Sequence, residues 1–317
     1  MRRIHLDTDL GSDTDDLCAL AMLLGWPEVE LTGITTVSDS QGLRVGFLDH
    51  ALRLADRQDI PVAAGADGSL TGFRGPVSFP FDSSDGRRYW PGPITPRPAP
   101  PGAALDLLAR SIATGATLVA IGPYTNLALL EAARPGSLAS TEVVLMGGYV
   151  TPPRPGLPDW GPAGDYNVQQ DALAAQLVFE RGNPLLVQLP VCLEVMLRAA
   201  HLPRLRTLGP LGDLLATQAE LHGADSHMAE LTRQHQALPA DLLNWQYDPL
   251  ACAVAAGWDG VQVEEFPLVV ATQDGVLSFA PDPAGKPTRV VTGVDAVRFE
   301  EEWLAAVARA ARARGRP

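Results

Sequence analysis

The sequence predicts an α/β fold: a single domain, residues 1–317, with a mostly parallel central sheet that is flanked by helices and carries long loops. Short β-type runs alternate with longer helical patterns, which is typical of a parallel sheet covered on both faces. No internal repeat or composition boundary divides the chain. Hydrophobic residues make up 46% of it, which is enough for a substantial core.

The first half of the chain alternates four strands with four helices. The run "RRIHLDTD" predicts a strand, and "DDLCALAMLLG", with acids in its first turn, predicts the helix that follows. The same two kinds of pattern recur as far as residue 135. The expected strands are 2–9, 29–38, 60–65 and 116–123, and the expected helices are 15–25, 42–57, 103–115 and 125–135.

The second half continues the alternation and ends in a helix. "TEVVLMGG" and "PLLVQLP" predict strands at 141–148 and 184–190. We expect helices at 170–182 and 248–257, and a mostly helical region at 201–243. Two or three strands and a terminal helix, at about 298–311, close the chain.

Two long segments interrupt this alternation. Residues 68–101 are rich in Gly, Pro and Ser, and residues 149–164 are rich in Pro and Gly. Loops of this length are unusual in a compact fold unless they bind a ligand or cover a site. We expect both to be active-site loops.

The chain is acidic, with a formal net charge of −13. Binding to nucleic acid and to anionic membranes is driven by basic surface, so this charge argues against both kinds of partner. It favours neutral or cationic small ligands, or a bound metal ion.

Three cysteines, Cys18, Cys192 and Cys252, lie far apart in apolar sequence. Such a set is typical of buried thiols in a reducing compartment and not of a disulfide framework or a zinc site. No secretory signal opens the sequence, and the longest apolar run, residues 17–26, is too short to span a bilayer. We therefore expect a soluble, cytoplasmic protein.

Five aspartates crowd the junction between the first strand and the first helix: Asp7, Asp9, Asp13, Asp15 and Asp16. Ligands of open α/β sheets bind beyond the carboxyl ends of the strands, so this cluster is expected at the functional edge. Helix capping and an acidic surface loop would explain one or two of the acids. A hard cation explains the whole cluster, because calcium takes about six to eight oxygen ligands and magnesium somewhat fewer.

Polar residues also mark the ends of other predicted strands. They are Thr125 at a helix start, Asp165 and Asn167 after the second long loop, and Asp248 before Pro249. Taken alone, Asp248 is typical of a helix cap, because Asp followed by Pro is common at helix starts.

Together these segments resemble the inosine-uridine-preferring nucleoside hydrolase family. The resemblance covers most of the chain, from "IHLDTDLGSDTDD" through "VELTGITTVSDS", "AIGPYTNLAL", "GDYNVQQDALAA" and "YDPLACAVA" to "VVTGVDAVRFEEEW". The aspartate cluster is the family's specific mark, although its common form is two residues shorter between the glycine and the paired acids. The resemblance implies a Rossmann-like fold of the nucleoside hydrolase type and a bound calcium ion.

The resemblance assigns metal ligands residue by residue. Asp9 resembles the calcium ligand that also accepts a proton from the attacking water, and Asp16 resembles a second, bidentate ligand. Thr125 resembles the residue that offers its backbone carbonyl. Asp248 resembles the distal carboxylate ligand, which replaces its capping interpretation.

The resemblance also implies contacts with the sugar. Asp15 would reach a ribose hydroxyl, and Asn167 would hold the 2′ or 3′ hydroxyl. Asp165 stands near the 5′ hydroxyl, where the family usually has Glu. Ser40 stands where Asn commonly binds the ribose, and we expect the neighbouring Asp39 to compensate.

The residues that would recognise the base depart most from the family pattern. Tyr247 stands where many members carry the His that protonates the leaving base, and Tyr is a much weaker acid. Asp159 and Asp82 replace the usual Asn and His. Trp90 is a candidate to stack on the base, and His227 is the preferred substitute acid. Packing for Trp90 and a surface position for His227 are the alternatives.

The sequence thus predicts calcium-dependent hydrolysis of a ribonucleoside, or a close ribosyl analogue, to free base and ribose, as in nucleoside salvage. One alternative is a non-catalytic, metal-dependent riboside-binding protein that has lost the leaving-group acid. Another is a magnesium-dependent phosphohydrolase with D-x-D after its first strand. The resemblance further implies a homodimer or homotetramer, and the base preference stays open.

Overall fold

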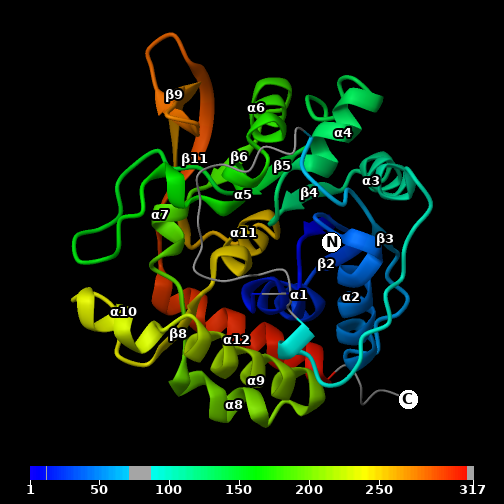
Figure 1. The fold of residues 1–317 in the computed structure, drawn as a ribbon, viewed down its shortest axis with the longest axis vertical. Helices are drawn as coiled ribbons and strands as arrows, with labels where there is room; N and C mark the ends of the chain where they lie inside the picture. The colour runs from blue at the N-terminus through cyan, green and yellow to red at the C-terminus, as the bar shows by residue number, and fades with distance from the viewer. Residues whose placement is uncertain (12, 71–86, 313–317) are drawn as a thin grey trace.

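A nine-stranded sheet runs through the middle of the molecule in the order β10-β9-β11-β6-β5-β4-β1-β2-β3 (Figure 1). The computed structural model describes residues 1–11, 13–70 and 87–312, so Asp82 lies outside the described residues. The strands are β1 (Arg2–Thr8), β2 (Val29–Thr36), β3 (Val62–Ala64), β4 (Thr117–Ala120), β5 (Val143–Met146), β6 (Leu185–Val187), β9 (Val261–Gln273), β10 (Val276–Pro281) and β11 (Lys286–Val294). The pairings from β3 to β11 are parallel, and β9 pairs antiparallel with β10 and β11.

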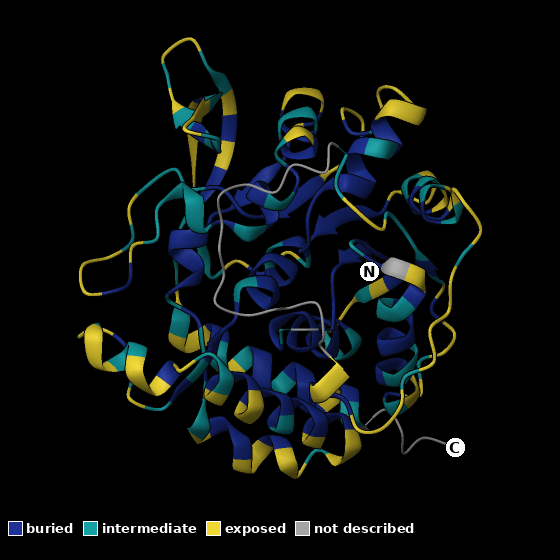
Figure 2. Cartoon of the chain, viewed as in Figure 1, coloured by how far each residue is buried: buried dark blue, intermediate teal, exposed yellow. Residues whose placement is uncertain are grey.

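Helices cover both faces of this sheet. Alternate residues of β4 point to opposite sides: Val119 belongs to one apolar cluster and Leu118 to another. The first cluster contains residues of α1 (Asp15–Gly25), α2 (Leu43–Leu54), α9 (Gly209–Asp225), α11 (Tyr247–Ala255) and α12 (Ala296–Arg312), and the second those of α3 (Ala103–Ala113), α4 (Thr125–Ala133) and α6 (Ala172–Arg181). Buried residues fill the central strands, and exposed ones gather on the outer helices and on the hairpin of β9 and β10 (Figure 2). The predicted α/β class is confirmed.

Most predicted elements agree with the structure to within a few residues. The helix expected at 15–25 matches α1, and the carboxyl ends of β1, β4 and β5 fall close to the predicted ones. The long aspartate segment follows β1 directly, so the fold carries it to the edge where the sheet strands end.

One predicted region and one unpredicted element differ from the expectation. The helix expected at 170–182 matches α6 to within two residues, but a separate short helix, α5 (Tyr166–Gln170), precedes it, and the Asp171 side chain accepts a hydrogen bond from Ala174 N where α6 starts. The region expected to be helical ends in a strand, β8 (Leu242–Trp245), which pairs antiparallel with β7 (Met196–Arg198). Both strands are as short as β3 to β6, but each contains a charged or amide residue, Arg198 or Asn244, and so lacks the apolar run that marks those strands in the sequence.

Shorter helices complete the fold. They are η1 (Ser40–Gly42), η3 (Pro162–Gly164), α7 (Leu189–Cys192), η4 (Ala199–His201), α8 (Leu202–Arg206) and α10 (Met228–Gln234). A small apolar cluster lies beneath the second long loop and joins that loop to β8 and α10. Among the described helices, none combines the length and apolar character needed to cross a membrane.

Candidate metal centre

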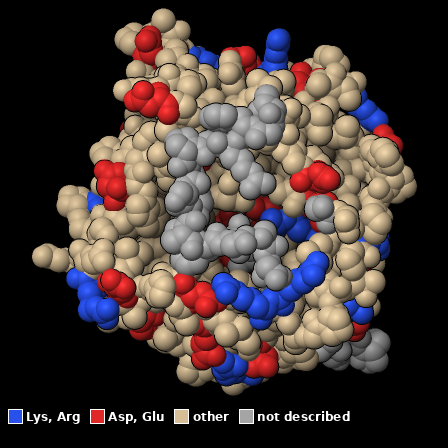
Figure 3. All heavy atoms as spheres, viewed as in Figure 1, with Lys and Arg blue, Asp and Glu red and all other residues tan. Residues whose placement is uncertain are grey.

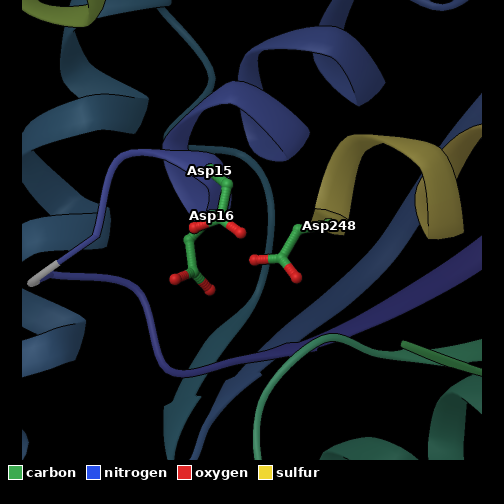
Figure 4. A group of neighbouring side chains, drawn as sticks. All are labelled: Asp15, Asp16 and Asp248. Atoms are coloured by element: carbon green, nitrogen blue, oxygen red, sulfur yellow. The ribbon is translucent and has the colours of Figure 1, made fainter. Parts of the chain in front are cut away.

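Three aspartates from opposite ends of the chain meet at the carboxyl edge of the sheet. Asp15 and Asp16 open α1, and Asp248 lies in the first turn of α11. One carboxylate oxygen from each lies within 4.8 Å of the other two, and the side chains converge in Figure 4. They are 6%, 4% and 3% exposed. We call these three residues the carboxylate cage.

The electrostatics of the carboxylate cage indicate what it can hold. Burial raises the pKa of each cage carboxyl well above its usual range, and repulsion between the carboxylates raises it further. Such a cluster is unfavourable in isolation. A divalent cation would offset its charge, and carboxylate oxygens are the ligands that Ca²⁺ and Mg²⁺ prefer. The donor set therefore fits a hard divalent metal ion.

Asp9 follows β1 and interacts with the cage and with a cation. Its charge raises the pKa of all three cage carboxyls. Its own pKa is raised by burial and lowered by Arg44, whose Nη2 lies 4.0 Å from Asp9 Oδ2. Acidic and basic atoms lie together in the hollow at the centre of this face (Figure 3). The sequence analysis missed Arg44, whose signal was a charged residue at the start of an apolar helix pattern.

Asp7 lies in β1, two residues before Asp9, and has a different role. Its Oδ1 accepts hydrogen bonds from Thr35 Oγ1 at 2.5 Å and from Asn126 Nδ2 at 2.8 Å. Asn126 also donates to Thr36 O and accepts from Ala66 N. This buried network ties β1, β2 and the start of α4 together, and burial raises the pKa of Asp7 to about 7. Asn126 is a structural residue that the sequence analysis did not single out.

Thr125 is the first residue of α4 and is buried. Its Oγ1 donates to Asp171 Oδ2 at 2.7 Å, and the same carboxylate accepts from Leu70 N at 2.9 Å. The side chain is thus held by α6, while the backbone of Thr125 lies at the edge of the sheet. Asp171, which the sequence analysis read only as part of a helix, fixes this end of α4.

Asp165 and Asn167 lie at the start of α5 and are both buried. Asp165 caps this helix by accepting from Val168 N at 3.2 Å, and it accepts a short hydrogen bond from Gly148 N. Burial raises its pKa to about 6, although these backbone donors oppose the shift. Asn167 Nδ2 donates to Ile121 O at 3.0 Å, at the end of β4. Their contacts with a sugar stay predictions.

The structure describes the backbone of Ser40, in η1, but not its side chain. The neighbouring Asp39 is fully engaged. Its Oδ2 accepts from Thr36 Oγ1 at 2.7 Å, and its Oδ1 accepts from Arg44 N at 2.8 Å. Oδ2 also accepts from Val45 N at 3.2 Å, so both oxygens hold the start of α2, which argues against the expectation that Asp39 would contact the ribose.

An aromatic row leads from the second long loop towards the carboxylate cage. Trp160 packs edge-on against Trp245 with 5.1 Å between ring centroids, and Trp245 lies 5.9 Å from Tyr247. Burial and the nearby Asp15 raise the pKa of Tyr247 well above its usual range. Asp159 is exposed and accepts a hydrogen bond from Tyr149 Oη at 2.7 Å, so it is part of the loop's own structure.

Trp90 and His227 are placed differently from the other predicted residues. Trp90 is 5% exposed, stacks on Phe47 at 4.7 Å between centroids, and donates from Nε1 to Gly11 O at 3.0 Å. In this structure it clamps the aspartate segment, and stacking on a base stays a prediction. His227 is exposed, with a φ of 51° at the junction of α9 and α10.

Comparison with known proteins identifies the family. The model of the inosine-uridine preferring nucleoside hydrolases matches residues 4–301. The chain belongs to this family. A pyrimidine-specific ribonucleoside hydrolase RihA from Salmonella agona is 34% identical over 224 residues, which cover 67% of this chain and 68% of the relative.

Solved structures agree with the fold of this nucleoside hydrolase. A purine-preferring ribonucleoside hydrolase from Gardnerella vaginalis superposes with a TM-score of 0.77 at 25% identity, covering 98% of this chain and 100% of that one. A plant nucleoside hydrolase gives a TM-score of 0.78 at 21% identity, covering 97% and 99%. Family membership makes the protein a hydrolase of N-glycosyl compounds, which disfavours the phosphohydrolase alternative.

The aspartate segment between β1 and α1 is held by contacts with distant parts of the chain. Asp13, within this segment, accepts from Asn244 Nδ2 at 2.6 Å, and His222 Nε2 lies 3.6 Å from the same oxygen. The segment is thus held by β8 and α9, as well as by Trp90. Asn244 carried no signal in the sequence, because its contact depends on the unpredicted strand β8.

Proposed function

We propose that this protein hydrolyses the N-glycosidic bond of a ribonucleoside, or a close ribosyl analogue, in a calcium-dependent reaction. The observation that carries the proposal is the carboxylate cage, in which residues 15 and 16 meet residue 248. In this proposal two cage residues, Asp16 and Asp248, hold the ion together with Asp9 and the backbone carbonyl of Thr125, while the third cage residue, Asp15, is left for the sugar. Bound Ca²⁺ would supply positive charge that grips the two ribose hydroxyls and acidifies a nearby water.

The chain's own residues then carry the reaction. Asp9 accepts the proton of the attacking water, because it is a buried carboxylate beside the cage. Asp15, Asn167 and Asp165 hold the ribose hydroxyls and orient the anomeric carbon. Breaking the bond builds positive charge on the ribosyl ring, which the surrounding carboxylates stabilise.

The departing base needs a proton or a hydrogen bond. Tyr247 is the donor that we propose, with His227 as the alternative, and Ser40, Asp159 and Trp90 complete the substrate contacts in this proposal. Tyr247 is the more direct candidate because it adjoins Asp248, whereas His227 is exposed. The raised pKa of Tyr247 favours hydrogen-bond donation over full proton transfer.

One experiment tests the proposal. The protein is loaded with Ca²⁺ and incubated with a panel of purine and pyrimidine ribonucleosides, and released reducing sugar is measured. We expect ribose release that is abolished by chelation and by Asp9→Ala, with the exposed Asp106→Ala as the matched control. Tight binding without turnover across the panel would favour the riboside-binding alternative, and phosphate release from nucleotides would favour a phosphohydrolase.

We also propose that the enzyme works in the cytoplasm, in nucleoside salvage, as a homodimer or homotetramer. Family resemblance supports the assembly. Light scattering coupled to gel filtration tests it, and a single monomeric mass at micromolar protein would contradict it.

A further inference from the structure

Arg44 is the cation that the structure places against Asp9. It lies in the first turn of α2, where its backbone N donates to Asp39 Oδ1, and its Nε donates to Ser38 O at 2.9 Å. The side chain is 14% exposed. Backbone and side chain are therefore both fixed, with the terminal nitrogens directed towards Asp9.

The hydrogen-bonding capacity of this guanidinium is mostly unused. An arginine carries five N–H donors, and Nε accounts for one of them. Nη2 is 4.0 Å from Asp9 Oδ2, which is an ion pair but longer than a hydrogen bond. The terminal nitrogens donate no hydrogen bond to the residues that the structure describes. Nearly buried donors need a partner, so the geometry leaves room for an oxygen from a ligand.

The position of Arg44 indicates which oxygen this is. In the proposed function Asp9 takes the proton of the water that attacks the anomeric carbon, so a group beside Asp9 lies beside that carbon. The hydroxyl nearest to the anomeric carbon is the 2′ hydroxyl. The net charge around the site is strongly negative, so a neutral hydroxyl fits better than an anion that needs a cluster of cations.

We propose that Arg44 is a substrate-binding residue that donates a hydrogen bond from its terminal nitrogens to the 2′ hydroxyl of the bound riboside. This inference rests on the proposed function. It adds to that function a specificity for ribosides over 2′-deoxyribosides that is separate from the metal ligands. Asp9 and Arg44 then contact opposite partners in one reaction, the water and the sugar.

A cycle of two enzymes and two substrates tests the inference. Uridine and 2′-deoxyuridine are compared on wild type and Arg44→Gln, each loaded with Ca²⁺, and kcat/KM is measured. We expect Arg44→Gln to lower kcat/KM for uridine by about 10- to 100-fold, the range for a hydrogen bond from a charged donor, and to change that for 2′-deoxyuridine by less than about threefold. In both enzymes, 2′-deoxyuridine lacks one of the two hydroxyls that the metal ion would bind. This loss lowers kcat/KM equally for wild type and Arg44→Gln, so it cancels when the two ratios are compared.

Three further measurements keep the test decisive. Arg44→Lys should recover part of the preference, because the charge stays but the fork is lost. Arg97→Gln removes an exposed ion pair with Asp49, which lies in α2 like Arg44, and this variant should leave the preference for ribosides unchanged. Ca²⁺ affinity, measured by calorimetry, should be unchanged or tighter in Arg44→Gln, because a positive charge near the cage has gone.

Several results would overturn the inference. The first is an equal loss of kcat/KM on uridine and 2′-deoxyuridine in Arg44→Gln. The second is that Arg44→Gln loses the discrimination against 3′-deoxyuridine and keeps that against 2′-deoxyuridine. The third is weaker Ca²⁺ binding in Arg44→Gln. If the wild type releases no sugar, the proposed function fails, and the same cycle is run on equilibrium binding of the two ligands. A 2′-dependent loss of binding in Arg44→Gln would then support the inference, and its absence would reject it.

Discussion

The two halves of the proposed site are built on different parts of the molecule. The metal half, formed by Asp9 and the carboxylate cage, starts from the end of β1 and the first turns of α1 and α11, which pack in the main core. The base half, formed by residues 149–164, Tyr247 and α10, packs on a small second cluster, and Trp160 and Tyr247 also contact the main core. That cluster contains the buried residues Leu157, Leu193, Met228, Leu238, Leu242 and Trp245.

This difference gives a physical reason for the expectation that the metal half resembles the family pattern more closely than the base half. Acids at strand ends and helix starts are positioned by hydrogen-bonded backbone within a large core, so a change there disturbs the fold as well as the ion. The base half is joined to the main core through few elements and contains the long loop. Its side chains can change without loss of the fold, and that is where Tyr247 and Asp159 depart from the family.

The largest expected effect comes from Asp248→Asn, which keeps the shape of the side chain and removes its charge. We expect Ca²⁺ affinity to fall by about 100-fold or more, because affinity in such sites depends on the number of charged ligands. Sugar release should fall by roughly a thousandfold at limiting calcium. Calorimetric titration and a reducing-sugar assay measure the two effects.

The same variant should be more heat-stable than wild type when no metal is present. Asp15 and Asp16 repel Asp248 in the buried cage, and the asparagine removes that repulsion. The rise in Tm on adding Ca²⁺ should correspondingly shrink. Asp106→Asn on the exposed face of α3 serves as control. If Asp248→Asn binds Ca²⁺ as tightly as wild type, the cage is not the metal site.

The next largest effect is expected from Tyr247→Phe, in the base half. We expect kcat on ribonucleosides to fall by about 10- to 100-fold, because the departing base loses its hydrogen-bond donor. Hydrolysis of p-nitrophenyl riboside should stay within about threefold, since nitrophenolate leaves without a proton. An equal loss on both substrates would mean that Tyr247 positions the sugar and not the base.

The pH dependence distinguishes a tyrosine donor from a histidine donor. Because burial and Asp15 raise the pKa of the Tyr247 phenol, it keeps its proton as the pH rises through the neutral and mildly alkaline range. The effect of Tyr247→Phe should therefore be the same at about pH 6 and about pH 9. A His donor would lose its proton above its usual pKa of about 6.5, and the wild-type rate on nucleosides would then fall across this range.

The contrast between the two halves also shows how far the sequence predicts the molecule. The alternation of strands and helices in the sequence predicts the sheet. The sequence also shows that Asp9 follows a strand and that Asp16 and Asp248 lie in the first turns of helices. The partners that hold these residues are not visible, because Asn126, Asp171 and Arg44 act through contacts between distant segments. Likewise, β7 and β8 are not visible, because Arg198 and Asn244 interrupt their apolar residues, although β8 leads into Tyr247.

A smaller effect is expected from Trp160→Leu, which loosens the second long loop. Trp160 is half-buried and packs on Trp245, so its replacement removes an aromatic pair worth about 1 kcal/mol. We expect KM for a ribonucleoside to rise about three- to tenfold while kcat changes less than twofold. Trp26→Leu, at the C-terminal end of α1 and thus at the other end of that helix from Asp15 and Asp16, should leave KM unchanged. A fall in kcat with unchanged KM would mean that Trp160 affects the chemical step and not substrate binding.

The smallest effect is expected from His227→Ala. The sequence makes His227 a candidate acid, but the structure places it exposed, in a left-handed turn where α9 ends and α10 begins. Such an imidazole reaches the base only if the turn moves, so kcat on uridine should change less than about twofold. His235→Ala, at the C-terminal end of α10, is the matched control. A tenfold loss on uridine without loss on p-nitrophenyl riboside would instead assign the proton to His227. It would also mean that the base half closes over the metal half during the reaction, because the exposed turn must then reach the substrate.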